Sequence, residues 1–318
     1  MYDIISQELV EPGGAKRFLG DRTRCRYCGA TDAIAFGKAT NAHALPVAFG
    51  NRTLFSLDEC KACNTKFSVY EDALCKAVGP FLTFGGVRGR NGVRQTGQTG
   101  SKSTVRHNVV AGKRQLSVAS HGEANELVGV DKATGSLKLT MPVEGDIFVP
   151  RYAYKALVKI ALSMLPPEEL PRFGKVIASL AELDAKPHGG VLQVGFSYAY
   201  VGNSPPALAG TLLRRRDHQA HAPYMIFVLM AGSVCFQIWL RSDELDDHVP
   251  EIGRLGVRFS AQLPKPEGGY LPIQFSDLLQ FDWSDLVPRS QPFEAFELTF
   301  NPKTTEGILR PVPRSGGV

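Results

Sequence analysis

Apolar residues in the second half of the chain gather in short runs that predict β-strands. The most apolar run, from Tyr224 to Leu240, is shorter than the roughly 20 residues that a membrane-spanning helix needs, and Gly232-Ser233 interrupts it. We therefore interpret this run as two strands joined by a tight turn. The predicted strands of this half are residues 191–200, 207–215, 224–231, 234–241 and 293–300.

Helical periodicity is clearest in residues 65–78, where Phe67, Tyr70, Leu74 and Ala77 share one face. This pattern predicts an amphipathic helix. Its apolar face is typical of a helix that packs on a core.

Two further helices are predicted over residues 151–165 and 168–183, separated by Pro166-Pro167. Residues 127–141 predict a hairpin with its turn at 132–136. Helices and strands do not alternate as they do around parallel sheets, so we expect an α+β fold with an antiparallel C-terminal domain.

Charge is distributed unevenly along the 318 residues. Residues 1–122 contain 17 Lys/Arg and 9 Asp/Glu, a net charge of +8, whereas residues 123–318 contain 19 and 22, a net charge of −3. This asymmetry indicates that the first part faces nucleic acid and the second does something else. The N-terminus lacks the basic and apolar regions of a signal peptide, so we expect a soluble, cytoplasmic protein without a membrane partner.

Four of the six cysteines form two CxxC pairs, and 31 residues separate Cys28 from Cys60. Two such knuckles complete a tetrahedral zinc site, and four protein ligands make it a closed, structural site. The alternative is two disulfides or unrelated thiols, which a reducing cytosol disfavours. The zinc ligands predicted here are Cys25, Cys28, Cys60 and Cys63.

The segment between the knuckles predicts a short strand, a turn and a second strand, followed by the helix at 65–78. The residues in this order are Cys-x2-Cys-Gly, Ala-His43-x2-Pro46-x3-Gly50-Asn51 and Glu59-Cys60-x2-Cys63-Asn64-x2-Phe67-x3-Glu71-Asp72. Together they resemble the HNH endonuclease family, in the branch whose ββα-metal finger is clamped by a four-cysteine zinc site. The resemblance covers about residues 20 to 80. Within the family, the chain is similar to bacterial members that often act in defence against phage.

The resemblance implies that His43 is the general base of a phosphodiester hydrolase, since a neutral imidazole takes a proton from water. It implies one Mg²⁺ or Mn²⁺ at the scissile phosphate and the leaving 3′-oxygen. Asn64 matches the final His/Asn position of the family and is the first metal-ligand candidate. Asn51 is expected to orient the loop that carries His43.

One departure concerns the metal ligands. Many HNH proteins carry an acidic ligand immediately before the base, where this chain has Ala42. Asn41 is a weaker ligand for a hard cation than a carboxylate. Glu71 and Asp72 either supply the missing charge, with Asp72 as the tentative ligand, or form a solvated helix face.

A glycine-rich basic tract follows the finger, and no acidic residue occurs between Asp72 and Glu123. Arginine offers bidentate contacts to phosphate and glycine lets the backbone approach it, which favours a grip on the nucleic-acid backbone. The alternative is a solvated basic loop. The predicted contacts are Arg88, Arg90, Arg94, Lys102 and Arg106.

We therefore expect an HNH nuclease domain at residues 1–85, a basic arm and hairpin at 86–145, and an α+β domain at 146–318 that binds a protein partner or an activating ligand. The expected function is metal-dependent hydrolysis of DNA with little sequence specificity. The alternatives are a non-catalytic zinc-containing nucleic-acid-binding subunit and a nuclease directed at RNA. The pair His218-x2-His221 lacks further ligands at a suitable spacing, and we interpret it as a loop.

Overall fold

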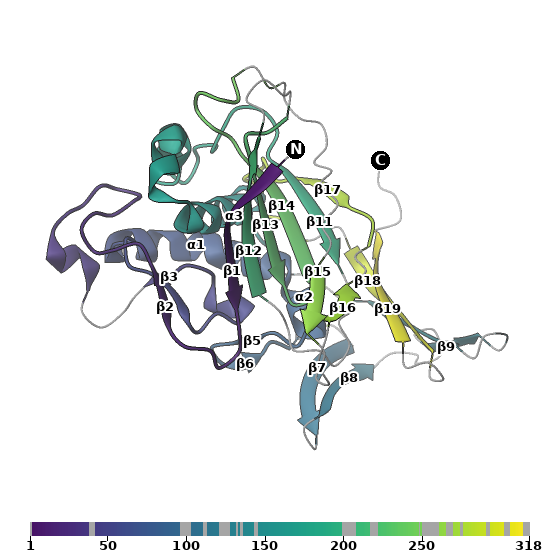
Figure 1. Ribbon diagram of the computed structural model, residues 1–318. Coiled ribbons are helices and arrows are strands. Elements are labelled where there is room, and N and C mark those ends of the chain that lie inside the picture. The colour runs from purple at the N-terminus through teal and green to yellow at the C-terminus, as the bar shows by residue number, and fades with distance from the viewer. Residues whose placement is uncertain are drawn as a thin grey trace.

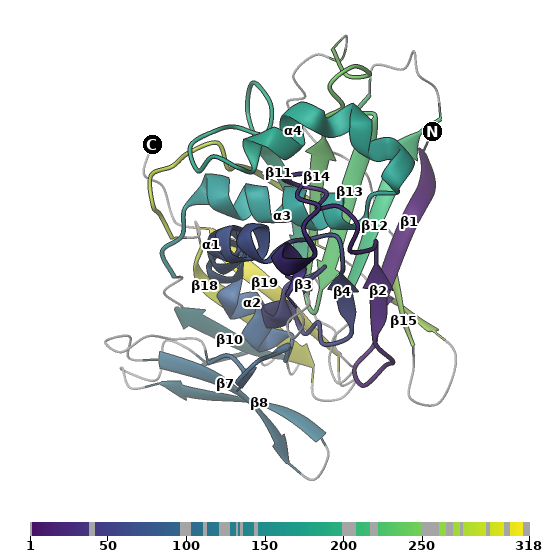
Figure 2. The ribbon, with the colours of Figure 1, turned by 90° about the vertical axis from the view of Figure 1, so that its left-hand side faces the viewer.

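The computed structural model is mixed α+β, and a large antiparallel sheet forms one layer with helices on one of its faces (Figures 1 and 2). The residues that the structure describes are 2–37, 42–95, 103–110, 113–120, 128–131, 133, 136–142, 146–198, 208–216, 222–247, 249, 261–264, 270–273, 276–290, 293–301 and 306–313.

The large sheet has six strands in the order β1-β12-β13-β14-β11-β17, and every neighbouring pair is antiparallel. Every residue of β13 and β14 is buried, as expected for strands at the centre of a covered sheet. The strand bounds are β1 (Tyr2–Val10), β11 (Gln193–Tyr198), β12 (Leu208–Arg215), β13 (Met225–Ala231), β14 (Val234–Leu240) and β17 (Leu279–Asp282).

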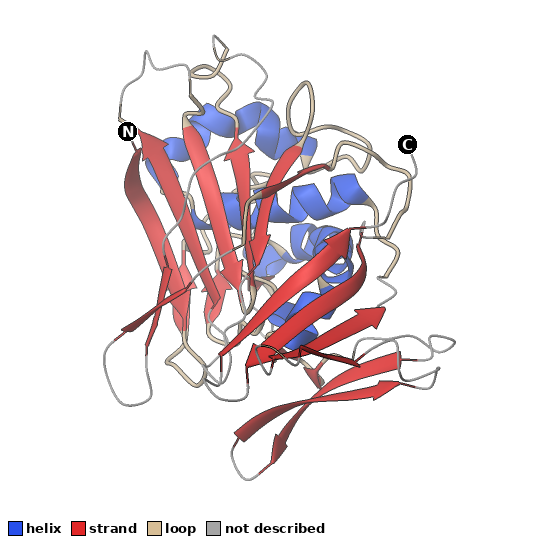
Figure 3. Ribbon diagram, turned by 90° about the vertical axis from the view of Figure 1, so that its right-hand side faces the viewer, coloured by secondary structure: helices blue, strands red, loops and turns tan. Residues whose placement is uncertain are grey.

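A second antiparallel sheet, in the order β19-β18-β10-β9, lies beside the first, and separate two-stranded hairpins accompany it (Figure 3). Its strands are β9 (Val128–Asp131), β10 (Ser136–Pro142), β18 (Phe293–Asn301) and β19 (Glu306–Pro313). The hairpins are β5 (Arg88–Gly89) with β6 (Gly92–Val93), β7 (Ser103–Val110) with β8 (Lys113–Ser120), and β15 (Ala261–Pro264) with β16 (Tyr270–Ile273).

The helices stack in front of the large sheet, with α3 between the sheet and α1 (Figure 2). Helix α3 is buried along almost its whole length, so it connects the N-terminal part of the chain to the sheet. The helices are α1 (Lys61–Ala77), α2 (Gly79–Phe84), α3 (Pro150–Met164) and α4 (Gly174–Ser179), with 3-10 turns at Ala33–Phe36, Val47–Phe49 and Pro167–Phe173.

A small three-stranded sheet precedes α1 and holds the residues between the two CxxC pairs. Its order is β2 (Arg17–Leu19), β4 (Leu54–Ser56) and β3 (Ala42–His43), with β2 parallel and β3 antiparallel to β4. The chain thus runs from β3 through a turn to β4 and directly into α1.

One continuous apolar core runs from this small sheet to the large one, and it includes Phe49, Tyr70, Leu157 and Phe227. The N-terminal strand β1 is the edge strand of the large sheet, next to β12. The division of the chain at residues 85 and 145 stays a prediction. The shared core means that α3 packs both on α1, which follows the small sheet, and on the large sheet.

The predicted strand pair within 224–240 and the helix predicted at 151–165 are confirmed, and Gly232 makes the turn at a positive φ of 60°. The helix predicted at 168–183 is wrong in extent, because Pro171 has no backbone N–H and the segment forms a 3-10 turn before the short α4. Strand β1 was not predicted. It is an edge strand with several exposed side chains, so its sequence shows little apolar alternation.

Candidate active site and metal centre

The thiols of Cys25, Cys28, Cys60 and Cys63 form one cluster in which all four sulfur atoms lie within 4.8 Å of one another. The Sγ–Sγ distance is 3.9 Å for Cys25 and Cys63 and 3.6 Å for Cys28 and Cys60. A tetrahedral site with Zn–S bonds of about 2.3 Å places its sulfur atoms about 3.8 Å apart. The cluster can therefore hold a metal ion such as zinc.

Backbone N–H groups and neighbouring thiols already favour a thiolate in this cluster. The hydrogen bond with Cys63 outweighs burial and lowers the pKa of the Cys25 thiol to about 4, and backbone N–H groups add to this effect. The contact with Cys25 raises the pKa of Cys63. Because one thiolate opposes the formation of the next, a divalent cation is the charge that lets all four ionise.

Helix α1 starts in the second knuckle, four residues before the predicted start. Cys60 is the N-cap, and its Sγ accepts a hydrogen bond from the Cys63 backbone N–H at 3.5 Å. This contact satisfies one of the free N–H groups of the first turn. The same cysteine therefore serves the metal cluster and the helix start.

The first knuckle is tied to the end of α3. Arg26 forms an ion pair with Asp58 at 2.5 Å and donates hydrogen bonds to the backbone carbonyls of Leu162 and Leu165, the latter at 3.2 Å. The Tyr27 hydroxyl donates to the Lys159 carbonyl at 3.1 Å. The cysteine cluster is thereby fixed against the buried helix.

His43 ends β3 and pairs with Phe55 of β4, with the two ring centroids 4.8 Å apart. Burial is the main cause that lowers the pKa of His43, and Lys159, Arg90 and Arg52 lower it further while Glu71 opposes them. The imidazole is thus neutral at physiological pH, the form that accepts a proton.

Asn51 is fully buried and holds the turn between β3 and β4. Its Nδ2 donates to the carbonyls of Leu45 at 2.8 Å and Leu54 at 2.7 Å, and its Oδ1 accepts from the N–H groups of Thr53 and Leu54. Because these bonds use the whole amide, Asn51 positions the loop that carries His43.

Lys159 contacts the backbone of His43, and the sequence did not single it out. Its Nζ donates to the His43 carbonyl at 3.0 Å and to Glu71 Oε1 at 2.9 Å, and it forms an ion pair with Glu59 at 3.0 Å. Burial disfavours the ammonium, but the carboxylates of Glu59 and Glu71 outweigh this effect and raise the pKa of Lys159. The one sequence signal is a lysine within the apolar stripe of a predicted helix.

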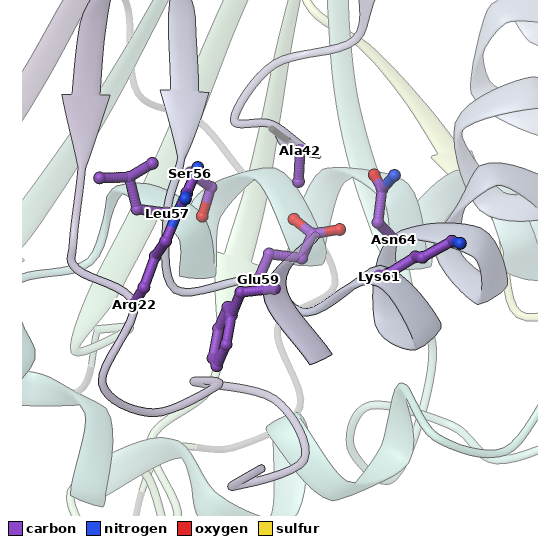
Figure 4. Close-up of a pocket in the computed structure, with 8 residues that line it drawn as sticks. Arg22, Ala42, Ser56, Leu57, Glu59, Lys61 and Asn64 are labelled. Carbon is purple, nitrogen blue, oxygen red and sulfur yellow. The ribbon is translucent and has the colours of Figure 1, made fainter. Parts of the chain in front are cut away.

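Glu59 has a side chain without solvent exposure, and burial raises its pKa to about 7. It lines a cavity of about 20 Å³ together with Ala42 and Asn64 (Figure 4). The other lining residues are Arg22, Phe36, Ser56, Leu57 and Lys61. The residue before His43 and the residue after the second knuckle thus meet at one cavity, beside a buried carboxylate.

The other acidic candidates lie elsewhere. Asp72 is on the exposed side of α1, where it pairs with Lys76 at 2.7 Å, and it does not line the cavity. Glu71 points inward to Lys159. Asn41 lies outside the described residues, as do His218 and His221.

The first part of the basic tract lies next to the loop that follows His43. The β5–β6 hairpin packs on the 3-10 turn Val47–Phe49, and Arg52 Nη2 donates to the Gly89 carbonyl at 2.6 Å. Arg88 and Arg90 are exposed on this hairpin, and Arg90 acts electrostatically on His43.

The remaining basic candidates are distributed differently. Arg94 forms an ion pair with Asp146. Arg106 is exposed on β7, and Lys102 lies outside the described residues. Of these candidates, Arg88 and Arg90 lie on the hairpin that packs beside the His43 loop.

The two cysteines outside the cluster, Cys75 and Cys235, are buried, and burial raises the pKa of both thiols, that of Cys235 to about 12. They are core residues rather than nucleophiles. None of the helices that the structure describes is long and apolar enough to cross a membrane.

No family model matches the chain, and no curated protein or solved structure shows a significant match to it. The resemblance to the HNH family therefore rests on the sequence pattern around His43, and what the structure adds is the four-cysteine cluster that could hold a metal ion.

Proposed function

We propose that the protein is a metal-dependent nuclease of the HNH type that hydrolyses DNA phosphodiester bonds with little sequence specificity. The observation that carries this proposal is the position of His43. It ends a strand of a β3–β4–α1 unit, directly after a residue that lines a cavity shared with Asn64, and the four-cysteine cluster lies at the base of α1.

In this proposal, His43 Nδ1 or Nε2 accepts the proton of a water molecule as its oxygen attacks phosphorus. The lowered pKa of His43 keeps the ring ready for this step. Asn51 fixes the loop and Lys159 holds the His43 carbonyl, so the backbone that carries the imidazole ring is held in place. Asn64 would hold a divalent ion, which supplies positive charge at the phosphate and the leaving 3′-oxygen when bound.

Arg52, Arg88 and Arg90 provide the contacts to the nucleic-acid backbone in this proposal. They lie on or beside the hairpin that packs next to the His43 loop. Contacts to phosphate carry no sequence information, which accounts for the low specificity that we propose.

A second function, a non-catalytic zinc module that binds nucleic acid, is favoured by one residue. Ala42 replaces the acidic metal ligand that many HNH proteins carry at this position. The two functions share the zinc cluster and the basic surface and differ only in cleavage.

One experiment separates the two functions. The zinc-loaded protein is incubated with Mg²⁺ or Mn²⁺ and either supercoiled plasmid or an RNA of matched length. We expect nicking of plasmid that stops when EDTA is added and that is much weaker in His43→Ala. Binding of DNA without nicking under any of these metals would favour the non-catalytic module, and preferential cleavage of the RNA would change the substrate.

A further inference from the structure

A larger pocket lies at the end of the large sheet where the N-terminus and α4 are found (Figure 2). Its volume is about 260 Å³, close to the roughly 300 Å³ at which ligand-binding pockets begin. The proposed nuclease uses none of its lining residues. We call it the arginine pocket, because the charged residues that line it are Asp3, Glu169, Arg172, Arg214, Arg215 and Arg216.

Segments far apart in the sequence form this pocket. Arg214 lies near the end of β12, opposite Asp3 of β1, so the two side chains share one face of the sheet. The 3-10 turn Pro167–Phe173 supplies Glu169 and Arg172. The pocket is therefore a product of the tertiary fold.

Glu169 holds two of the arginines in place from inside the protein. Its carboxylate is buried, and its Oε1 accepts a hydrogen bond from Arg214 Nη1 at 2.9 Å. Its Oε2 accepts from Arg172 Nε at 3.1 Å and from the Tyr224 hydroxyl at 2.9 Å. Because one buried carboxylate orients both guanidinium groups, they are preorganised for a ligand.

Arg172 and Arg214 also keep donors that a ligand can use. The bonds to Glu169 occupy one N–H of each guanidinium, which carries several in a planar fork. The two arginine side chains are 40% and 42% exposed and line the pocket, so further N–H groups are accessible from it.

The other two arginines of the pocket each have a carboxylate of their own. Arg216 pairs with Asp3 at 2.7 Å, and both side chains are largely exposed at the rim. Arg215 lies 3.9 Å from Asp246, and neither side chain is exposed. These two pairs are balanced in charge.

Arg172 and Arg214 are not balanced in this way, because they share the single carboxylate of Glu169. Arginine stays protonated in proteins, so among the described residues this part of the pocket carries a net charge of +1. An anion is the ligand that would offset this charge.

We propose that the arginine pocket binds a small phosphomonoester, with its phosphate group held by Arg172 and Arg214. Glu169 is a positioning residue in this site, since both of its oxygens already accept hydrogen bonds from the protein. The inference goes beyond the proposed nuclease and does not depend on it.

The choice of phosphate follows from the two arginines. A phosphomonoester presents three acceptor oxygens and a charge of about −1.5 to −2 at pH 7, so it can accept from two guanidinium forks at once. A planar carboxylate would only repeat the contacts that Glu169 already makes. One water molecule requires roughly 10–15 Å³, so a pocket of about 260 Å³ also leaves room for a small organic group.

The test is isothermal titration calorimetry of the full-length, zinc-loaded protein with adenosine 5′-monophosphate, and separately with inorganic phosphate, without DNA or added divalent metal. We expect both to bind in competition at one site, and adenosine not to bind. Affinity should fall about tenfold or more in Arg172→Gln and in Arg214→Gln. Arg241→Gln is the matched control, because Arg241 lies over the Trp239 ring and does not line the pocket. Its affinity should equal that of the wild type.

Several results would overturn the inference. They are wild-type protein that binds neither ligand, Arg214→Gln that binds as tightly as the wild type, equal weakening by Arg214→Gln and Arg241→Gln, and tighter binding of succinate than of phosphate. The urea midpoint shows whether each variant is folded. If Arg214→Gln does not fold, Arg214→Lys keeps the charge but loses the planar fork, and weaker binding is again the expected result.

The same titration distinguishes two sources of the phosphate. Displacement of adenosine 5′-monophosphate by a 5′-phosphorylated oligonucleotide, but not by its 5′-hydroxyl form, would support the site with a strand end as its ligand. Displacement by neither would support a free small molecule. Displacement by both would place the ligand on a general DNA-binding surface and would reject the site.

The inference and the proposed function fail separately. Phosphate binding at the arginine pocket without any nicking of plasmid would reject the nuclease and leave the pocket in place. Nicking that requires His43, in a protein that binds neither phosphate nor adenosine 5′-monophosphate, would reject the pocket and leave the nuclease in place.

Discussion

Lys155 and Lys159 lie one turn apart on α3 and both are fully buried, yet their surroundings differ. Lys159 meets two carboxylates, which raise its pKa. Lys155 donates to the backbone carbonyls of Ser179, Glu182 and Leu183 and lies over the Tyr70 ring, and burial lowers its pKa to about 8.

The difference separates a structural contact from a candidate site. Lys155 satisfies carbonyls at and just after the end of α4, where a positive charge complements the helix dipole. Lys159 instead joins Glu59, Glu71 and the loop of His43. We infer that Lys159 belongs to the surroundings of the candidate site and that Lys155 is a structural contact.

The largest expected effect comes from removing zinc. It should unfold the region that contacts Lys159 while the centre of the large sheet stays folded. Binding of structural zinc contributes roughly 10–16 kcal/mol in small zinc modules. Cys60→Ser should lose the metal, and hydrogen exchange should become fast over residues 20–77 while β13 and β14 stay protected. Cys235→Ser removes a buried thiol outside the cluster and should keep one zinc per chain.

This account would be contradicted if Cys60→Ser retained its zinc, or if exchange in residues 20–77 did not change. Metal content by mass spectrometry and hydrogen exchange on the same samples give both answers.

The next largest effect compares the two lysines directly. Lys159→Met leaves the buried Glu59 and the partly buried Glu71 without their cation and should cost about 3–5 kcal/mol of unfolding free energy. Lys155→Met leaves only carbonyls without a donor and should cost about 1–3 kcal/mol. Urea unfolding of both variants measures which of them loses more unfolding free energy.

An equal or larger loss in Lys155→Met would show that the carboxylates do not distinguish the two regions. Adding Glu59→Gln to Lys159→Met should recover part of the loss, because it removes one of the unpaired charges.

A smaller effect is the contribution of Lys155 to the pH dependence of the unfolding free energy. Its pKa is about 8 in the folded protein and about 10.4 in an unfolded chain, so the unfolded state binds more protons between these values. Lys155 therefore contributes stability that is complete above pH 10.4 and is lost as the pH falls through 8. The difference in unfolding free energy between the wild type and Lys155→Met should rise with pH across this window, and a difference independent of pH would contradict the lowered pKa.

The smallest expected effect concerns the basic residues beside His43. Arg90→Ala should weaken binding to all DNA sequences about equally and reduce the slope of log affinity against log salt by about 1. Arg216→Ala is the control, because that exposed arginine pairs with Asp3 at the edge of the large sheet. A loss confined to some sequences, or an equal change in both variants, would contradict a backbone contact near His43.

The sequence predicted the cysteine cluster well because CxxC spacing is local and its geometry leaves few alternatives. The central strands and α3 were also predicted, since their apolar residues form continuous stripes. The 3-10 turn at Pro167–Phe173 was missed because Pro171 interrupts a helical pattern.

The surroundings of His43 were not predictable from local patterns. Glu59 and Lys159 are 100 residues apart in the sequence, and only the packing of α3 against α1 brings them together. Glu71 and Asp72 show the same limit. They are neighbours on one helix, yet Glu71 faces Lys159 while Asp72 lies on the exposed side.

The most direct test of the central proposal is the rate of plasmid nicking by the wild type and by His43→Ala, with equal zinc content and equal DNA binding confirmed for both. The account predicts a rate at least about 100-fold lower in His43→Ala, the usual contribution of a general base. Nicking at the same rate by both proteins would contradict the role of His43 and with it the proposed nuclease site.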